Sequence, residues 1–244
     1  MNSAPALHLS GDLCVAGRVL CQALDLHCQA RAWTALLGPS GIGKSTLARL
    51  ICGLPCPAHL GGGITADDGV SLQGRTTLMA QTDQLLPWAD VLANVTIGAR
   101  LRGTRPDRAR ARQLLEQVGL AEFAHRRPAT LSGGQRQRVA LARTLMEDHS
   151  IVVMDEPFSA LDAATRATMQ DLAARMLQRR TVILITHDPL EAARMASRAF
   201  LLGPDGARPV DVPQTPTPRG VSDPATLDAQ AALYRRLMAQ GQTA

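Results

Sequence analysis

The sequence predicts an α/β protein in which short buried strands alternate with helices. Three runs of apolar or β-branched residues, at 33–37, 151–154 and 181–186, have the length and composition of parallel strands covered on both faces. Segments with apolar residues at helical spacing lie between the first two runs, at 45–52 and 139–146. This alternation favours a largely parallel sheet flanked by helices.

The composition is that of a chain that folds around a core. It has 244 residues, 45% of them apolar, and 26 basic against 21 acidic residues give a net charge of +5. This balance excludes disorder as the main state, and the length fits one large domain, alone or with a small subdomain. No apolar run reaches the ~20 residues that a membrane-spanning helix needs. Residues 1–10 lack the basic cluster and apolar stretch of a secretory signal.

The chain has five cysteines, and an odd number without an export signal suggests reduced thiols. The spacing of Cys52 and Cys56 could belong to a metal pair. No second Cys or His pair with zinc-site spacing accompanies them, so small packing residues are the favoured interpretation.

A single lysine occurs among the 26 basic residues, and its position indicates phosphate chemistry. Lys44 lies in Gly38-Pro-Ser-Gly-Ile-Gly-Lys-Ser45, which has the full spacing of a phosphate-binding loop between a strand and a helix. Glycines let backbone N–H groups surround phosphate oxygens, and a helix N-terminus adds partial positive charge. Lys44 would reach the β- and γ-phosphates, and the Ser45 hydroxyl would ligate Mg²⁺. The nucleotide-binding residues expected in this loop are Gly38, Pro39, Ser40, Gly41, Gly43, Lys44, Ser45 and Thr46.

Polar side chains also follow the other strand candidates. Asp155 and Glu156 come directly after residues 151–154, and His187 comes after the next strand. Ligands of open α/β sheets bind beyond the carboxyl ends of strands, so these side chains are expected at the nucleotide. One carboxylate would hold Mg²⁺, the other would act as general base on the attacking water, and His187 would donate to the γ-phosphate. Gln81, after another short strand candidate, would contact the metal and the water.

A second phosphate-binding helix start is expected at Ser132. The segment Leu131-Ser-Gly-Gly-Gln-Arg-Gln-Arg138 opens a strong helical pattern, in which Ser132 is a good cap and two glycines leave their N–H groups open. One γ-phosphate does not need two such helix starts in the same chain. The economical explanation is a head-to-tail pair of chains, each presenting this segment to the partner's nucleotide. The residues concerned are Ser132, Gly133, Gly134 and Gln135.

Together these motifs resemble those of the ATP-binding subunit of ABC transporters. The resemblance covers about residues 7–203 and depends on the order and spacing of six segments. They are Gly38–Thr46, Gln81, Leu131–Gln135, Asp155 with Glu156, Ser159–Asp162 and His187. The resemblance implies a RecA-like P-loop NTPase core of the α/β class, with an N-terminal antiparallel β subdomain and an inserted α-helical subdomain at about 83–130. It also implies two ATP sites in a homodimer and transmembrane permease subunits as partners.

The resemblance further implies a role for each site residue. Glu156, His187 and Gln81 would be catalytic, Ser45, Gln81 and Asp155 would hold the metal, and ATP and Mg²⁺ would be the cofactors. The subunit would sit peripherally on the cytoplasmic face of a bacterial inner membrane, served indirectly by a solute-binding protein. The segments 83–88, 91–95 and 101–103 resemble those of nitrate, sulfonate and taurine importers, whose relatives carry pyrimidine precursors of thiamine.

One departure from the family pattern concerns the adenine base. The family usually places an aromatic residue roughly 25 positions before the phosphate loop, but no Phe, Trp or Tyr occurs from Met1 to Ala32. Trp33 is too close to the loop to take this role. An aliphatic residue near Leu13 or Val15 is expected to replace the aromatic ring, with weaker ATP binding and looser base choice, because stacking contributes about 0.5–1.5 kcal/mol beyond burial.

The expected organisation is an ATPase domain at 1–203, a Pro-rich linker at 204–223 and a short C-terminal helix at 224–244. The Arg-rich segment 100–112 raises the alternative of a soluble ATPase that acts on nucleic acid. Helix-forming residues up to Val118 favour a solvated helix face instead, and an aromatic content of 2% provides few stacking platforms, so no nucleic acid partner is expected. A nucleotide-gated module without turnover is disfavoured by the intact carboxylate and histidine of the site.

Overall fold

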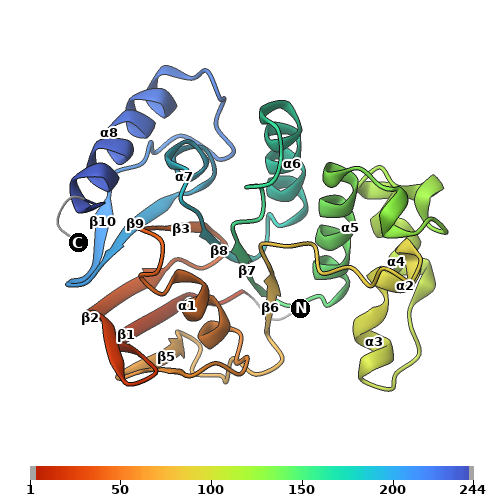
Figure 1. Ribbon diagram of the computed structural model, residues 1–244, viewed down its shortest axis with the longest axis horizontal. Helices are drawn as coiled ribbons and strands as arrows, with labels where there is room; N and C mark the ends of the chain where they lie inside the picture. The colour runs from red at the N-terminus through yellow and green to blue at the C-terminus, as the bar shows by residue number, and fades with distance from the viewer. Residues whose placement is uncertain (1–3, 242–244) are drawn as a thin grey trace. The chain divides into compact units, whose positions relative to one another are not determined.

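A computed structural model describes residues 4–241, which divide into two compact units. Unit 1 comprises residues 4–78, 150–156 and 177–241, and contains nearly all of the strands. Unit 2 comprises residues 79–149 and 157–176, and consists mainly of helices (Figure 1). The two units are described in turn.

The N-terminal part of unit 1 is a four-stranded antiparallel sheet. It contains β1 (Leu7–Val15), β2 (Arg18–Cys28), β4 (Ala58–Leu60) and β5 (Gly63–Ala66), with β2, β4 and β5 all paired to β1. Leucines alternate with polar residues along β1, so one face of the sheet is buried and the other meets solvent. The antiparallel subdomain implied by the family resemblance is therefore confirmed.

The second sheet of unit 1 has six strands in the order β10-β9-β3-β8-β7-β6. Strands β9, β3, β8 and β7 run parallel to one another, and β10 is antiparallel to β9. The three strands expected from apolar runs are present and completely buried, as parallel strands between covering layers must be. The bounds are β3 (Trp33–Leu37), β6 (Thr76–Met79), β7 (Ile151–Asp155), β8 (Thr181–Ile185), β9 (Arg198–Gly203) and β10 (Gly206–Val210).

Helices pack on unit 1's sheets to form two hydrophobic cores. One core contains α1 (Lys44–Ile51), the inner face of the antiparallel sheet, and alternate residues of the six-stranded sheet such as Leu36. The other contains α7 (Pro189–Met195), α8 (Pro224–Gly241) and the alternate residues of β3. Because strand side chains alternate between faces, β3 contributes to both cores and is held at the centre of the unit.

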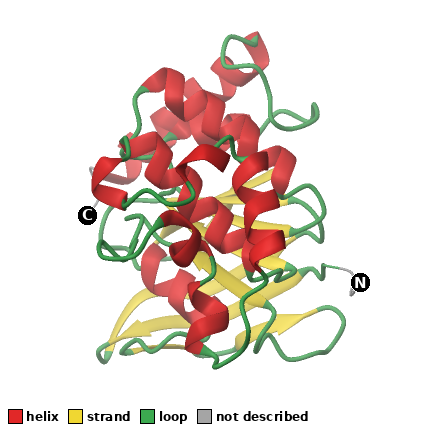
Figure 2. Cartoon of the chain, turned by 90° about the vertical axis from the view of Figure 1, so that its right-hand side faces the viewer, coloured by secondary structure: helices red, strands yellow, loops and turns green. Residues whose placement is uncertain are grey.

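Unit 2 is helical, and its helices are drawn in red in Figure 2. Helices α2 and α4 pack against the longer α5, which also contacts α6. The apolar residues of α4 lie on one stripe that faces this core, with arginines on the outside. The bounds are α2 (Val91–Val95), α3 (Ile97–Leu101), α4 (Arg108–Gln117), α5 (Gly133–Met146) and α6 (Ala163–Met176), with 3₁₀ turns at Ala121–Phe123 and Pro128–Thr130.

Residues 204–223 differ from the extended linker that their prolines suggested. The stretch contains β10, which pairs with β9, and the almost completely buried Arg219. The Arg219 guanidinium donates to the carbonyl oxygens of Ala193 at 2.6 Å and Ala196 at 2.8 Å. A proline-rich composition favours extended backbone, and here neighbouring groups hold that backbone against α7.

Within residues 4–241, none of the helices combines the length and apolar character that crossing a bilayer requires. The five cysteines are free thiols, as expected. Burial raises the pKa of Cys28 and of Cys52 to about 12, so both are poor nucleophiles and act as packing residues.

Candidate functional site

The loop between β3 and α1 is built for close approach to a ligand. Gly38, Pro39, Ser40, Gly41 and Gly43 precede the helix, and Lys44, Ser45 and Thr46 form its first turn. Gly43, the N-cap residue, has a φ of 100°, and a Cβ there would lie 2.8 Å from Cδ2 of Leu13. Only glycine combines this backbone angle with this lack of space. The sequence-predicted loop therefore leads directly into a helix N-terminus, where backbone N–H groups lack intrahelical partners.

The side chain of Lys44 lies inside this loop. Its Nζ donates to the carbonyl oxygens of Gly38 at 2.7 Å and Pro39 at 2.8 Å. Burial lowers the pKa of Lys44, and the nearby charges of Glu156 and Asp155 oppose that shift. The ammonium is thus largely buried and is held by two backbone carbonyls of the loop, from which it can reach an anion.

Asp155 ends β7 in the same unit, and only 8% of it is exposed. The Ser45 hydroxyl donates a hydrogen bond to this carboxylate, and burial is the main cause of its raised pKa. Its Oδ1 atom is buried and has no hydrogen-bond partner among residues 4–241. A buried carboxylate oxygen without a donor, next to a hydroxyl, is the type of ligand set that Mg²⁺ prefers. The residues present therefore fit a magnesium ion.

Glu156 and His187 form a pair at the ends of adjacent strands. His187 Nδ1 lies 3.1 Å from Glu156 Oε1, and the Glu156 carboxylate is much less exposed than the imidazole. Glu156 has a left-handed backbone with a φ of 47°, and its N–H donates to the carbonyl oxygen of Ile185 at 2.9 Å. A non-glycine residue pays about 1–3 kcal/mol for such a conformation, which is maintained here by the bond to β8. With this backbone conformation, the side chain of Glu156 lies against His187.

The start of α5 in unit 2 carries the cap that the sequence predicted. Ser132 Oγ accepts from the N–H of Gln135 at 3.3 Å, and Gln135 Oε1 accepts from the N–H of Ser132 at 2.9 Å. This reciprocal capping box leaves the N–H groups of Gly133 and Gly134 without intrahelical acceptors. A Cβ on Gly134 would lie 2.7 Å from Cγ2 of Thr165, so glycine is needed where α5 meets α6.

The structure brings together one group of predicted residues and places the others in unit 2. The phosphate loop, Asp155, Glu156 and His187 lie in unit 1, all at carboxyl ends of strands β3, β7 and β8. Gln81 and the capped start of α5 belong to unit 2.

Two further polar residues in unit 2 were not anticipated. Asn94 is fully buried; its side chain accepts from the N–H of Leu86 at 2.7 Å and donates to three carbonyl oxygens, including that of Asp90 at 3.0 Å. Arg143 donates to the carbonyl oxygens of Asp83 at 2.6 Å and Gln84 at 2.8 Å. Both residues fix the segment 83–90, and no sequence pattern distinguishes them from solvent-exposed polar residues.

Comparisons with known proteins agree with this geometry. The sequence model of a family described as "ABC transporter" matches residues 21–159. The aliphatic sulfonates import ATP-binding protein SsuB 1 of Rhodococcus jostii is 44% identical over 222 residues, covering 89% of this chain and 85% of its own. The taurine import ATP-binding protein TauB of Pseudomonas entomophila is 48% identical over 195 residues, covering 77% and 74%. An aliphatic sulfonates import ATP-binding protein SsuB of Delftia acidovorans is 40% identical over 237 residues, covering 96% and 95%.

A solved structure has the same fold. It is that of cbiO1 from Clostridium perfringens, described as part of the ABC transporter complex cbiONQ, with a TM-score of 0.72. The two chains are 23% identical, and the match covers 84% of this chain and 87% of the other. The expected α/β P-loop architecture is thereby confirmed.

Proposed function

The chain belongs to the ABC transporter family of ATPases, and we propose that its ATP hydrolysis energises an importer of small sulfonate-type solutes. The observation that carries this proposal is the group formed by the phosphate loop, Asp155, Glu156 and His187 at neighbouring strand ends. The names of two relatives mention import of aliphatic sulfonates and of taurine. These solutes share a sulfonate group, so sulfonates are the cargo class that we propose. Nitrate and pyrimidine precursors of thiamine are the further cargo candidates.

Residues of unit 1 would hold the triphosphate. On nucleotide binding, Lys44 would exchange its bonds to two loop carbonyls for phosphate oxygens, while backbone N–H groups at the start of α1 bind the same phosphates. Ser45 and Asp155 would hold Mg²⁺, joined by Gln81. When bound, Mg²⁺ neutralises charge on the phosphate oxygens.

Glu156 and His187 would carry out the hydrolytic step. Glu156 would accept a proton from the attacking water as general base. The contact of His187 Nδ1 with Glu156 would orient that carboxylate. A His187 ring that carries a proton on each nitrogen would then also donate from Nε2 to the γ-phosphate. The left-handed backbone of Glu156 would support this arrangement, because the residue is fixed by its bond to β8.

A second copy of the chain would complete each site. The N–H groups of Gly133 and Gly134 would bind the γ-phosphate held by the partner, with Ser132 and Gln135 maintaining the cap. ATP would then lie between two protomers, and its hydrolysis would open the dimer.

The segment after Gln81 would contact the permease. Trp88 is 72% exposed and Leu101 is 80% exposed, although large apolar side chains are normally buried. Asn94 and Arg143 hold the backbone next to Trp88, so its ring is presented on an ordered loop. Transmembrane subunits would dock here, which would place the chain at the cytoplasmic face of the membrane, with a solute-binding protein acting on the permease from outside.

Val15 is the residue proposed to replace the missing adenine-stacking aromatic. The other candidate, Leu13, is 0% exposed and lies directly against Gly43, so it belongs to the core beneath the phosphate loop. Val15 ends β1 and is only partly buried. A valine offers the base a smaller contact than an aromatic ring and no stacking.

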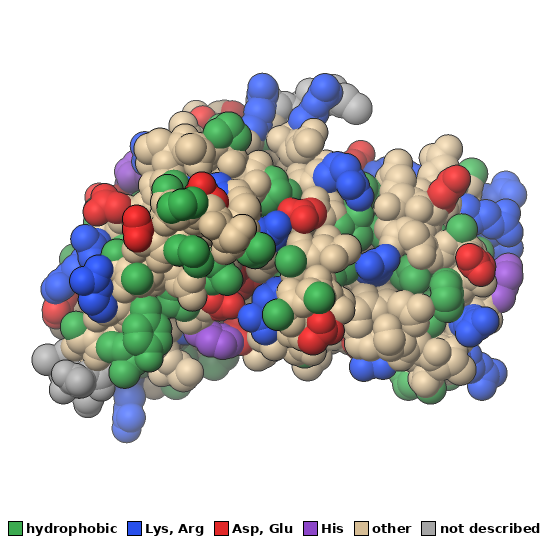
Figure 3. Space-filling model, turned by 90° about the horizontal axis from the view of Figure 1, so that it is seen from above, with side chains coloured by type: hydrophobic (Ala, Val, Ile, Leu, Met, Phe, Trp, Pro, Cys, Tyr) green, Lys and Arg blue, Asp and Glu red, His purple; other side chains and the backbone are tan. Residues whose placement is uncertain are grey.

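The nucleic-acid alternative receives little support from the Arg-rich segment. Arg102 pairs with Glu147, and Arg110 lies 3.0 Å from the carboxylate of Asp148. On the face shown in Figure 3, both acidic and basic side chains occur. Nucleic-acid interfaces concentrate positive charge in one patch or stripe.

ATP turnover by the purified chain tests the proposed function. Glu156→Gln is expected to lower kcat by at least ~10²-fold while retaining ATP binding, and to trap an ATP-dependent dimer on size-exclusion chromatography. The matched control is Glu116→Gln on the exposed side of α4, which should leave turnover unchanged. Unchanged turnover in Glu156→Gln would remove the assigned base. The cargo class is tested in vesicles that contain the chain together with a permease encoded beside it. ATP-dependent uptake of taurine is compared there with uptake of nitrate.

A further inference from the structure

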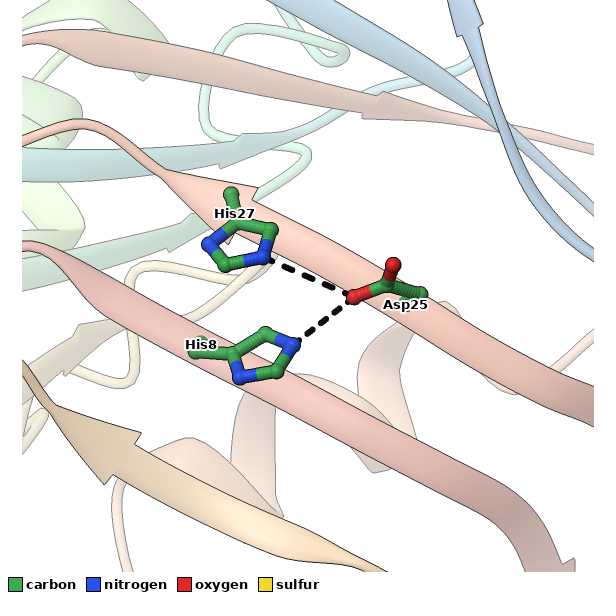
Figure 4. A group of neighbouring side chains, drawn as sticks. All are labelled: His8, Asp25 and His27. Atoms are coloured by element: carbon green, nitrogen blue, oxygen red, sulfur yellow. Dashed lines mark hydrogen bonds and ion pairs between the residues drawn. The ribbon is translucent and has the colours of Figure 1, made fainter.

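Three metal-ligand side chains meet on the solvent face of the antiparallel sheet in unit 1. His8 lies on β1, and Asp25 and His27 lie on β2. The register pairs His8 with His27 across the two strands, and Asp25 lies two residues from His27 on the same face. Figure 4 shows both imidazoles directed at the carboxylate of Asp25. This group, which we call the His-Asp-His cluster, has no part in the nucleotide site.

The ligand atoms of the cluster are close to the spacing of a metal site. The Nε2 atoms of His8 and His27 lie 2.7 Å and 3.6 Å from Asp25 Oδ1. One ligand atom from each residue can be chosen so that all three lie within 4.8 Å of one another. Tetrahedral zinc bonds of about 2.0–2.1 Å separate ligand atoms by roughly 3.3 Å. The imidazole rings are stacked, 4.0 Å apart and 7° from parallel, so a modest tilt of exposed rings would direct both nitrogens at one ion.

We propose that His8, Asp25 and His27 bind one divalent transition-metal ion, with Zn²⁺ as the representative ion. Imidazole nitrogens favour zinc, copper and nickel over the hard cations magnesium and calcium, and a single carboxylate completes a three-ligand set. With three protein ligands on an exposed surface, the remaining coordination positions belong to water. The site goes beyond the proposed ATPase function and does not depend on it.

The charge balance of the cluster supports a cation. Among residues 4–241, the only ion-pair contacts of Asp25 are with these two histidines. A divalent ion would bring one positive centre to all three ligands at once. It is also the only such three-residue group found in the part of the chain that the structure describes.

A bound ion would join the two longest strands of the sheet. Residues 8 and 27 lie at the open end of the β1–β2 pair, away from the turn after Val15. The other end of the pair supplies Leu13 and Leu20, which would contact a Cβ at Gly43 of the phosphate loop. Metal binding would therefore stabilise the hairpin on which the phosphate loop packs.

Calorimetric titration of the tag-free, nucleotide-free chain with ZnCl₂ tests the proposal. We expect one ion per chain, with affinity lowered at least ~10-fold by His8→Gln and by His27→Gln. Two controls are matched to the chain. His125 lies 3.4 Å from Asp90 without a second imidazole, so His125→Gln should change affinity less than twofold. Cys56→Ser removes a partly buried thiol and should also leave affinity unchanged.

Spectroscopy on the unmodified chain makes the test independent of variant folding. Stoichiometric Zn²⁺ should shift the imidazole NMR signals of His8 and His27 and leave that of His125 in place. Amide exchange should become slower at residues 7–10 and 25–28. Equal affinity in the His27→Gln variant, loss of binding in Cys56→Ser, or no saturable binding with unshifted imidazole signals would each overturn the proposal.

Discussion

Removal of one charge from the nucleotide site should stabilise the chain when no nucleotide is present. Asp155 is buried, its Oδ1 has no hydrogen-bond partner among the described residues, and burial raises its pKa. In Asp155→Asn the side chain keeps its shape and an acceptor for the Ser45 hydroxyl, but loses the charge. The substitution therefore tests whether the charge of Asp155, which Mg²⁺ binding needs, lowers the stability of the nucleotide-free chain.

The expected magnitude follows from the surroundings of Asp155. A buried polar group without a partner costs about 1–3 kcal/mol, and more when it is charged. The nearby ammonium of Lys44 offsets part of this cost, whereas the carboxylate of Glu156 increases it. We expect Asp155→Asn to raise the free energy of unfolding by about 1–2 kcal/mol. For a chain of this length that corresponds to a Tm increase of about 2–8 °C.

The difference in Tm between Asp155→Asn and the parent chain should depend on pH. Because the native pKa of Asp155 is raised, the native state binds this proton more tightly than the unfolded chain does. The contribution of Asp155 to stability is therefore present at low pH and is lost as pH rises through the native pKa. The Tm advantage of Asp155→Asn should be small near pH 4, the ordinary range of an aspartate, and largest at neutral pH.

Scanning calorimetry with and without Mg²⁺-ATP checks this reasoning. Saturating Mg²⁺-ATP at about 100 times its Kd would stabilise the parent chain by about 2.7 kcal/mol, and the variant much less, so the order of the two Tm values should reverse. Asp228→Asn, an exposed position on α8, is the control and should leave Tm within about 1 °C. A nucleotide-free Asp155→Asn chain that melts at or below the parent temperature at neutral pH would refute the reasoning.

Three more predictions concern binding, turnover and loop order. Val15→Tyr should tighten ATP binding about 2- to 10-fold in a calorimetric titration, because it restores an aromatic surface for adenine; strong ATP preference over GTP in the parent chain would contradict this. His187→Gln should lower kcat at least ~10-fold with less than a twofold change in ATP affinity, since the contact with Glu156 is lost; an unchanged kcat in a steady-state assay would exclude the assigned role. Arg143→Lys should destabilise the chain by about 1–3 kcal/mol and speed amide exchange at residues 85–90, because it removes the planar fork whose two nitrogens, Nη1 and Nη2, each reach one carbonyl, of Gln84 and Asp83; unaltered exchange there would show that the loop is held by other contacts.

The parts of the fold and site that the sequence predicted are those set by local rules. The phosphate loop is recognisable because glycines with positive φ must precede the helix, and Gly43 has this conformation and no space for a side chain. Asp155 and Glu156 are recognisable because they follow a buried strand directly. Ser132 is recognisable because a capping box needs only residues within one turn.

Features that depend on distant contacts were beyond sequence reasoning. Five prolines between residues 204 and 218 suggested a linker, but β10 forms because β9 provides an edge for pairing. Asn94 is an ordinary residue in the sequence and gains its role only when the loop 83–90 returns to its side chain. In both places the deciding partner lies outside the local pattern.

The His-Asp-His cluster shows how a small register change determines a candidate site. Next to the turn, Val15 pairs with Arg18, and a regular hairpin continued from that pair would place His8 opposite Asp25. Two irregularities between Gly11 and Cys14 shift the register by two residues in total, so that His8 faces His27 instead. An even shift keeps every side chain on its original face and changes only its neighbour. The bulges therefore convert one His–Asp pair into a three-ligand group.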